Sequence, residues 1–197
     1  IINEVKKITD IDAVQFKPNK QLIEILSDEI DQLYLDQIKK LSLNPEINEK
    51  HKNLKIVYTP LHGTGVELVP AVLKKFGFQN IIHIPEQDET NGDFPTVKSP
   101  NPEEKAALKI AISKAEQENA DIVMATDPDS DRVGIAIRNP EGKITILNGN
   151  QAATLLLNYL ITQWEEKKKL KGKEYIVKTI VTTELLTEMA EDYNIES

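Results

Sequence analysis

The chain has 197 residues, no cysteine and a formal net charge of −8. These features exclude disulfides, cysteine-ligated zinc and thiol catalysis, and they argue against a nucleic-acid binder, which usually presents a basic surface. Apolar residues make up 40% of the chain, but no run of 18 occurs, so we expect no membrane span. The lack of cysteine permits a reducing compartment, and we expect a cytoplasmic location. The chain opens without a signal peptide or initiator Met, which suggests a piece of a longer protein.

The first part of the chain predicts a long helix followed by strands and a shorter helix. Apolar residues at steps of three and four predict an amphipathic helix over 19–43, with Asn19 as its N-cap and Asn44-Pro45 at its end. Gly77 and Asn194 are expected to adopt left-handed backbone at the ends of two later helices. The next segments are predicted as a strand over 54–59, a turn over 60–65, a helix over 66–76 and a strand over 80–84.

The second part alternates strands and helices after a long loop over 85–101. It is predicted to contain a helix from Pro102 to about Glu118, a strand over 121–126, a hairpin over 133–147, a helix over 148–168, a strand over 174–180 and a helix over 182–193. This alternation predicts an α/β fold with three layers (α/β/α) and a mixed, mostly parallel sheet. A boundary near Asn148 would separate a complete domain over 1–147 from the truncated start of another over 148–197.

Three carboxylates carry the strongest chemical signal in the sequence. Asp127, Asp129 and Asp131 follow an apolar strand, and alternate side chains of an extended segment share a face. Three anions held within ~4 Å repel by roughly 1 kcal/mol per pair in water. Arg132 offsets part of that charge, and a divalent cation would offset the rest. Oxygen ligands alone favour magnesium, manganese or calcium.

Two other interpretations of this segment can be weighed from the sequence. A solvated acidic turn is the simpler one, but the position at the end of a strand, where α/β proteins bind ligands, favours a site. An EF-hand requires Gly at loop position 6 and Glu at position 12. Those positions hold Arg132 and Arg138, so an EF-hand is rejected.

The segment Thr59-Pro-Leu-His-Gly-Thr-Gly65 is a second candidate, between a strand and a helix. Its glycines would let backbone N–H groups approach an anion at the helix start, although a plain structural turn fits about as well. His62 could contact phosphate or transfer protons, but a lone histidine more often has a structural role. Ser99 could be a nucleophile, but no base is visible nearby, so an ordinary turn is favoured there.

The two motifs together resemble the α-D-phosphohexomutases, most closely their phosphoglucomutase/phosphomannomutase branch. The resemblance rests on Thr59–Gly65 and on Ala125-Thr-Asp-Pro-Asp-Ser-Asp-Arg-Val-Gly134, and it continues through Gly149-Asn-Gln-Ala152 and Lys178–Thr183. Members of this family have four domains around a cleft, and a phosphoserine in the first domain. The resemblance places this chain on the second domain and the start of the third.

The resemblance also implies a set of roles. Asp127, Asp129 and Asp131 would ligate Mg²⁺, and Arg132 would contact the transferred phosphate. His62 stays a catalytic candidate on the reasoning from the residues given above. The whole protein would interconvert hexose 1-phosphate and hexose 6-phosphate through a bisphosphate intermediate such as glucose 1,6-bisphosphate. Its partners would be the hexose phosphate and the remaining domains of the parent chain, with no nucleic acid or membrane.

Departures from the family pattern limit what this chain is expected to do. Pro128 stands where the family loop commonly has Gly, although the three aspartates are kept. The phosphoserine motif Thr-Ala-Ser-His-Asn-Pro, the Gly-Glu-x-Ser-Gly sugar loop and the fourth-domain phosphate loop are absent. We therefore expect no mutase activity from this chain alone. The alternatives are a magnesium-dependent phosphatase of the haloacid dehalogenase kind, a nucleotide-sugar transferase, and a non-catalytic module that binds sugar phosphate or metal.

Overall fold

The computed structural model describes residues 1–197, which form two compact units, Ile1–Tyr34 and Leu35–Ser197. The first unit contains the short helix α1 (Ile2–Val5) and the 3₁₀ turns η1 (Ile11–Ala13) and η2 (Lys20–Leu22), none of which buries a residue. The helix α2 (Asp28–Lys39) starts near the end of this unit. The prediction of one helix over 19–43 is therefore wrong before Asp28. Helices gain most of their stability from packing, whereas Leu22 and Leu26 remain exposed.

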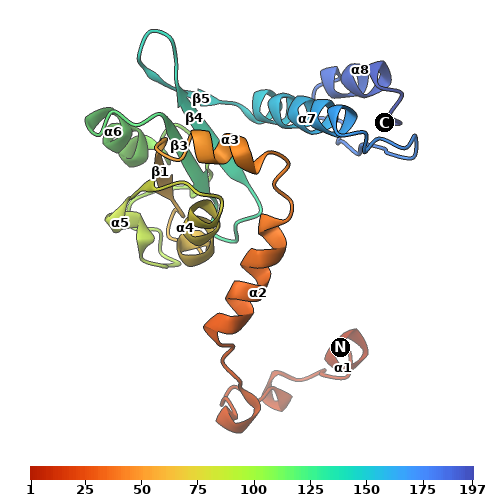
Figure 1. The fold of residues 1–197 in the computed structure, drawn as a ribbon. Helices are drawn as coiled ribbons and strands as arrows, with labels where there is room; N and C mark the ends of the chain where they lie inside the picture. The colour runs from red at the N-terminus through yellow and green to blue at the C-terminus, as the bar shows by residue number, and fades with distance from the viewer. The chain divides into compact units, whose positions relative to one another are not determined.

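Five strands form one mixed sheet in the order β2-β1-β3-β4-β5 (Figure 1). β1 pairs in parallel with both β2 and β3, whereas β3–β4 and β4–β5 are antiparallel. The predicted mixed sheet is confirmed, but two of its four pairings are parallel, so parallel pairing makes up half of the sheet rather than most of it. The strands are β1 (Lys55–Thr59), β2 (Asn80–His83), β3 (Ile122–Thr126), β4 (Val133–Arg138) and β5 (Ile144–Leu147).

Helices cover both faces of this sheet, as the three-layer prediction requires. Val57 of β1 packs with Ala111 and Ala115 of α6 (Lys109–Gln117) in one hydrophobic cluster. The next residue, Tyr58, points to the opposite face and lies against the start of α4 (Gly65–Lys75). Alternate residues of one strand thus pack against different helices, as the two-residue repeat of a strand dictates.

Several short or shifted helices differ from the sequence prediction. Pro45 begins a new helix, α3 (Pro45–Lys50), and the long loop contains a single helical turn, α5 (Pro85–Asp88). The helix expected from Pro102 begins only at Lys109. Asn101 accepts a hydrogen bond from the backbone N–H of Glu103, as an N-cap residue would, but residues 102–108 form successive turns before the regular helix starts.

The last fifty residues form a small helical pair with its own core. α7 (Gly149–Glu166) begins at a capping box made by Asn148 and Gln151, and it packs beside α8 (Leu185–Asp192) (Figure 1). Asn44 donates hydrogen bonds from Nδ2 to Tyr159 Oη at 3.2 Å and to Gln163 Oε1 at 2.6 Å.

No helix of the structure is both long and apolar enough to cross a bilayer.

The strand predicted over 174–180 is wrong, because only Tyr175 makes an isolated bridge, to Glu196. A strand needs a neighbouring backbone to satisfy its N–H and C=O groups, and the apolar side chains of Val177 and Ile180 are exposed here. The expected left-handed positions are confirmed, with φ of 105° at Gly77 and 57° at Asn194.

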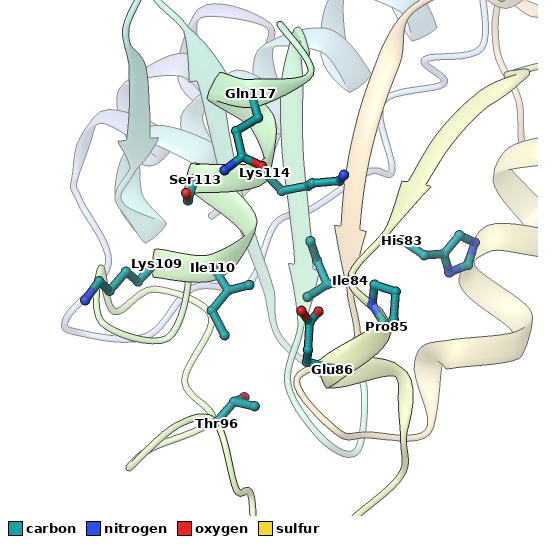
Figure 2. A pocket seen from close by; sticks show the side chains of 10 residues that line it. All are labelled: His83, Ile84, Pro85, Glu86, Thr96, Lys109, Ile110, Ser113, Lys114 and Gln117. Atoms are coloured by element: carbon teal, nitrogen blue, oxygen red, sulfur yellow. The ribbon is translucent and has the colours of Figure 1, made fainter.

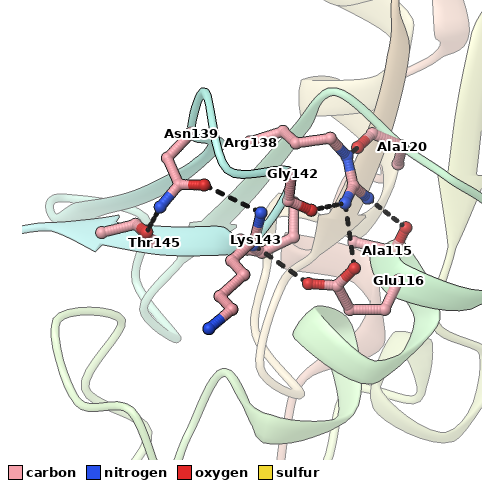
Figure 3. Close-up of polar contacts among 9 residues, drawn as sticks. Ala115, Glu116, Ala120, Arg138, Asn139, Gly142, Lys143 and Thr145 are labelled. Atoms are coloured by element: carbon pink, nitrogen blue, oxygen red, sulfur yellow. Dashed lines mark hydrogen bonds and ion pairs between the residues drawn. The ribbon is translucent and has the colours of Figure 1, made fainter.

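Arg138 joins the hairpin to the end of α6 (Figure 3). Its guanidinium donates to the backbone oxygens of Ala115, Ala120 and Gly142, and it forms an ion pair with Glu116 at 2.9 Å. Glu116 in turn accepts a hydrogen bond from the backbone N–H of Ile144 at 3.0 Å. This network fixes the antiparallel hairpin against the helix on the α6 face of the sheet.

Candidate metal centre

The three predicted aspartates meet in one tight loop directly after β3. Carboxylate oxygens of Asp127, Asp129 and Asp131 all lie within 4.8 Å of one another. The loop is a turn rather than the extended segment assumed from the sequence: the N–H of Ser130 donates to the backbone oxygen of Asp127 at 3.0 Å. Pro128 occupies the second position of this turn, where proline is favoured. The turn therefore gathers the carboxylates on one side.

Arg132 closes the loop by donating two hydrogen bonds to the carboxylate of Asp127. Its backbone N–H donates to Asp127 Oδ1 at 3.0 Å, and its Nε donates to Oδ2 at 2.7 Å. Asp127 is buried, and burial alone would raise its pKa, but the hydrogen bonds from Arg132 outweigh that effect and hold the pKa below its usual value. Asp127 is therefore an anion at neutral pH. The Arg132 side chain remains 56% exposed.

The other two carboxylates are exposed and repel each other. The charge on Asp129, followed by contact with Asp127, raises the pKa of Asp131 above its usual value. Arg132 Nε lies 3.8 Å from Asp131 Oδ1 and offsets only part of this charge. A set of three oxygen donors, one fixed and two facing solvent, fits a hard divalent cation such as Mg²⁺. The structure brings the three predicted residues together, while their role as ligands stays a prediction.

The turn over 60–65 lies directly against this loop. The N–H of Thr64 donates to the backbone oxygen of Pro128 at 2.8 Å, and its hydroxyl donates to the same oxygen at 3.1 Å. A Cβ added to Gly63 would lie 2.3 Å from Pro128 Cα, and one added to Gly65 would lie 2.4 Å from Tyr58 Oη. The two glycines thus permit close packing of protein against protein, which supports the structural interpretation of this turn.

His62 is buried, with both ring nitrogens hydrogen-bonded. Nδ1 lies 2.9 Å from the backbone oxygen of Glu89, and Nε2 lies 2.8 Å from Thr96 Oγ1. Since a carbonyl oxygen only accepts, Nδ1 is the nitrogen that donates to Glu89. Gln87 extends this network by donating to Thr96 Oγ1 and accepting from Thr59 Oγ1. His62 therefore holds the loop after β2 in place, and a part in phosphate chemistry stays a prediction.

Ser99 takes no part in the candidate centre. Its hydroxyl donates to Glu104 Oε1 at 3.2 Å, a contact that provides no general base of the serine–histidine kind. This agrees with the interpretation of Ser99–Pro102 as an ordinary turn. The backbone oxygen of Pro102 packs so closely on β4 that a Cβ at Gly134 would lie 2.0 Å from it.

A hollow of about 710 Å³ opens elsewhere, between the end of β2 and α6 (Figure 2). Its polar lining comes mainly from Lys109, Ser113, Lys114 and Gln117, which project from α6. None of the three aspartates lines it. Thr96 connects it to His62 through the hydrogen bond described above. We place the candidate centre at the aspartate loop, because the charged donors converge there.

Two contributions to the site are not evident from the sequence. Thr64 and Pro128 are 64 positions apart, and no local pattern predicts that their backbones meet. Ser130 adopts a left-handed conformation, with φ of 61°. This could have been expected only if residues 127–130 had been predicted as a turn. The one signal available in the sequence was the pair Gly63 and Gly65, since glycines in a turn permit close approach of another segment.

Comparison with known proteins gives one consistent result. The profile described as "Phosphoglucomutase/phosphomannomutase, alpha/beta/alpha domain II" matches residues 32–142. Phosphoglucomutase from Staphylococcus aureus (strain MRSA252) is 34% identical over 196 residues, which cover 99% of this chain and 34% of that protein. Human glucose 1,6-bisphosphate synthase is 37% identical over 161 residues, covering 80% of this chain and 26% of that protein. The chain thus spans about a third, or less, of the length of these relatives.

Solved structures show the same fold at lower identity. A Thermus thermophilus protein assigned as a phosphomannomutase superposes with a TM-score of 0.61 at 20% identity, over 85% of this chain and 35% of that one. A phosphoglucomutase/phosphomannomutase family protein from Burkholderia thailandensis gives 0.55 at 19% identity, over 87% of this chain and 38% of that one.

Proposed function

Because the chain belongs to the phosphoglucomutase/phosphomannomutase family, we propose that it supplies the metal loop of a longer enzyme that interconverts hexose 1-phosphate and hexose 6-phosphate. The observation that carries this proposal is the convergence of three carboxylates within 4.8 Å at the end of β3. Their all-oxygen donor set suits Mg²⁺, which would supply positive charge to stabilise a phosphoryl group during transfer.

Each residue of the loop has a distinct task in this proposal. Asp127 is a fixed anionic ligand, because Arg132 binds both of its oxygens. Asp129 and Asp131 face solvent and complete the protein's share of the ligands. The guanidinium of Arg132, which is 56% exposed, keeps N–H groups available for a phosphate oxygen. A guanidinium suits this task because its planar N–H groups match phosphate geometry.

The rest of the catalytic apparatus would come from other parts of the parent protein. We propose that residues 1–147 include the metal-loop domain and that 148–197 begin the sugar-binding domain. Ile161, Ala190 and Ile195 form a hydrophobic cluster separate from those under the sheet, which supports this division within the compact unit Leu35–Ser197. The phosphoserine would come from a preceding domain, and glucose 1,6-bisphosphate would serve as activator or intermediate. This chain alone would then lack mutase activity. We expect the parent to be cytoplasmic.

A phosphatase of the haloacid dehalogenase kind would use the first aspartate as its nucleophile. Asp127 is poorly suited to that role, because it is 1% exposed and both of its oxygens accept hydrogen bonds from Arg132. A nucleophile must bring one oxygen within bonding reach of a bulky phosphorus centre, which so buried a carboxylate does not do, whereas a cation needs only the lone pair that each hydrogen-bonded carboxylate oxygen keeps. The geometry therefore supports Asp127 as a metal ligand.

Intact-mass measurement separates these functions. The purified chain and its Asp127→Asn variant would each be incubated with glucose 1,6-bisphosphate and Mg²⁺, and conversion of glucose 1-phosphate to glucose 6-phosphate would be assayed in parallel. We expect no covalent phosphate and no conversion in either case. A base-labile phosphate that the variant loses would indicate an aspartyl nucleophile and overturn the proposal. Robust conversion by the chain alone would refute the requirement for an external phosphoserine.

A further inference from the structure

Thr64 makes a contact that the proposed metal chemistry does not explain. Its N–H and its hydroxyl both donate to one acceptor, the backbone oxygen of Pro128, at 2.8 and 3.1 Å. Pro128 lies between two of the carboxylates, Asp127 and Asp129, and it has no N–H of its own. The carbonyl oxygen of Pro128 is therefore its one backbone group that can form a hydrogen bond with another segment and so fix the position of the residue.

The glycine before Thr64 adds a close contact to these hydrogen bonds. A Cβ on Gly63 would lie within 2.3–2.8 Å of three backbone atoms of Pro128, so even a methyl group would push the two segments apart. Such contacts with backbone are costly to relieve, because backbone atoms cannot rotate away as a side chain does. Thr64 and Gly63 thus set the position of Pro128 from one side.

The turn that carries Thr64 is itself firmly anchored. The N–H of Leu61 donates to Thr59 Oγ1 at 3.1 Å, and the N–H of His62 donates to the backbone oxygen of Gln87 at 2.9 Å. Leu61 and His62 are both buried. A rigid turn fastened to the end of β1 therefore supports the acidic turn at the end of β3 on the neighbouring strand.

We propose that Thr64 is a positioning residue of the metal centre, acting through the Pro128 carbonyl. By fixing the peptide between Asp127 and Asp129, it holds two like charges together before the cation binds. Groups that orient metal ligands tune affinity without touching the metal. This inference rests on the proposed function, because it requires that the aspartates bind a divalent cation.

Binding of Mn²⁺ to the purified chain tests this inference without relying on catalysis. The loss of the aqueous Mn²⁺ signal in electron paramagnetic resonance would give the affinity of wild type, Thr64→Val and Thr64→Ser. Asp129→Asn would define binding at the loop. Gly63→Ala would be compared with Gly92→Ala, a matched control because a Cβ at Gly92 meets nothing within 4 Å. Thermal unfolding of every variant would report structural effects separately.

We expect Thr64→Val to weaken Mn²⁺ binding about three- to tenfold, the range that one hydrogen bond supports. Thr64→Ser should keep affinity within about twofold, since it retains the hydroxyl. Gly63→Ala should weaken binding, and Gly92→Ala should leave it unchanged. Equal affinity of wild type and Thr64→Val, with binding still lost in Asp129→Asn, would overturn the positioning role alone. An absence of loop binding in wild type would overturn the metal-loop function and this inference with it.

Discussion

Replacing Arg138 with alanine should destabilise the fold more than any other single charge removal on the hairpin. Arg138 donates to three backbone oxygens and pairs with Glu116, and its side chain is only 20% exposed. A hydrogen bond contributes about 0.5–1.5 kcal/mol, somewhat more when one partner is charged. Water would replace some of the four contacts, so we expect a loss of roughly 2–4 kcal/mol in the free energy of unfolding.

Urea denaturation followed by circular dichroism would measure this loss. Lys143→Ala is the matched control, because Lys143 is an exposed cation on the same hairpin (Figure 3). Its change should stay within about 0.5 kcal/mol. Arg138→Lys should recover less than half of the loss, since an ammonium cannot reproduce the planar set of N–H donors. A loss below about 1 kcal/mol for Arg138→Ala would refute our account of this network.

Three further predictions concern stability. The backbone N–H of Ile144, and then the Arg138 guanidinium, hold the pKa of Glu116 below its usual 4.5. The contribution of ionised Glu116 to the free energy of unfolding is therefore present above pH 4.5 and is lost as the pH falls through the lowered pKa. The stability gap between wild type and Glu116→Gln should therefore narrow in acid, and a gap independent of pH would contradict this. Gly65→Ala places a Cβ 2.4 Å from Tyr58 Oη and should cost about 1–3 kcal/mol in urea denaturation; an unchanged midpoint would show that the contact relaxes freely. Gln87→Ala removes the acceptor for Thr59 and should cost about 1–3 kcal/mol by the same measurement, whereas a neutral effect would mean that water replaces the amide.

The five strands and the aspartate loop could be predicted from the sequence because their signals are local. The strand before Asp127 is apolar and short, and the turn Asn139–Gly142 marks the hairpin directly. The aspartate cluster followed from the position of three acids at a strand end. These features depend on residues that are adjacent in the sequence, so they can be recognised without knowing the fold.

The wrong and missed predictions share one physical cause. Each concerns a segment whose structure depends on packing or hydrogen bonding with residues that are distant in the sequence. The helix expected from Asn19 matches the 3.6-residue period, yet Leu22 has no surface to pack against within its unit. The segment over 174–180 has strand composition, yet only Tyr175 finds a backbone partner. The contact between Thr64 and Pro128 was missed for the converse reason, since it joins two loops that only the parallel pairing of β1 and β3 brings together.

A titration of the ¹⁵N-labelled chain with Mg²⁺, followed through backbone amide shifts, tests the central claim most directly. A metal loop supported by the adjacent turn predicts saturable shifts concentrated at Asp127–Arg132 and extending to Thr64, whose N–H donates to Pro128. Asp129→Asn should abolish them. Shifts scattered over the acidic surface, or no saturable change in the loop, would contradict our proposal that this chain supplies the metal-binding loop of a longer enzyme.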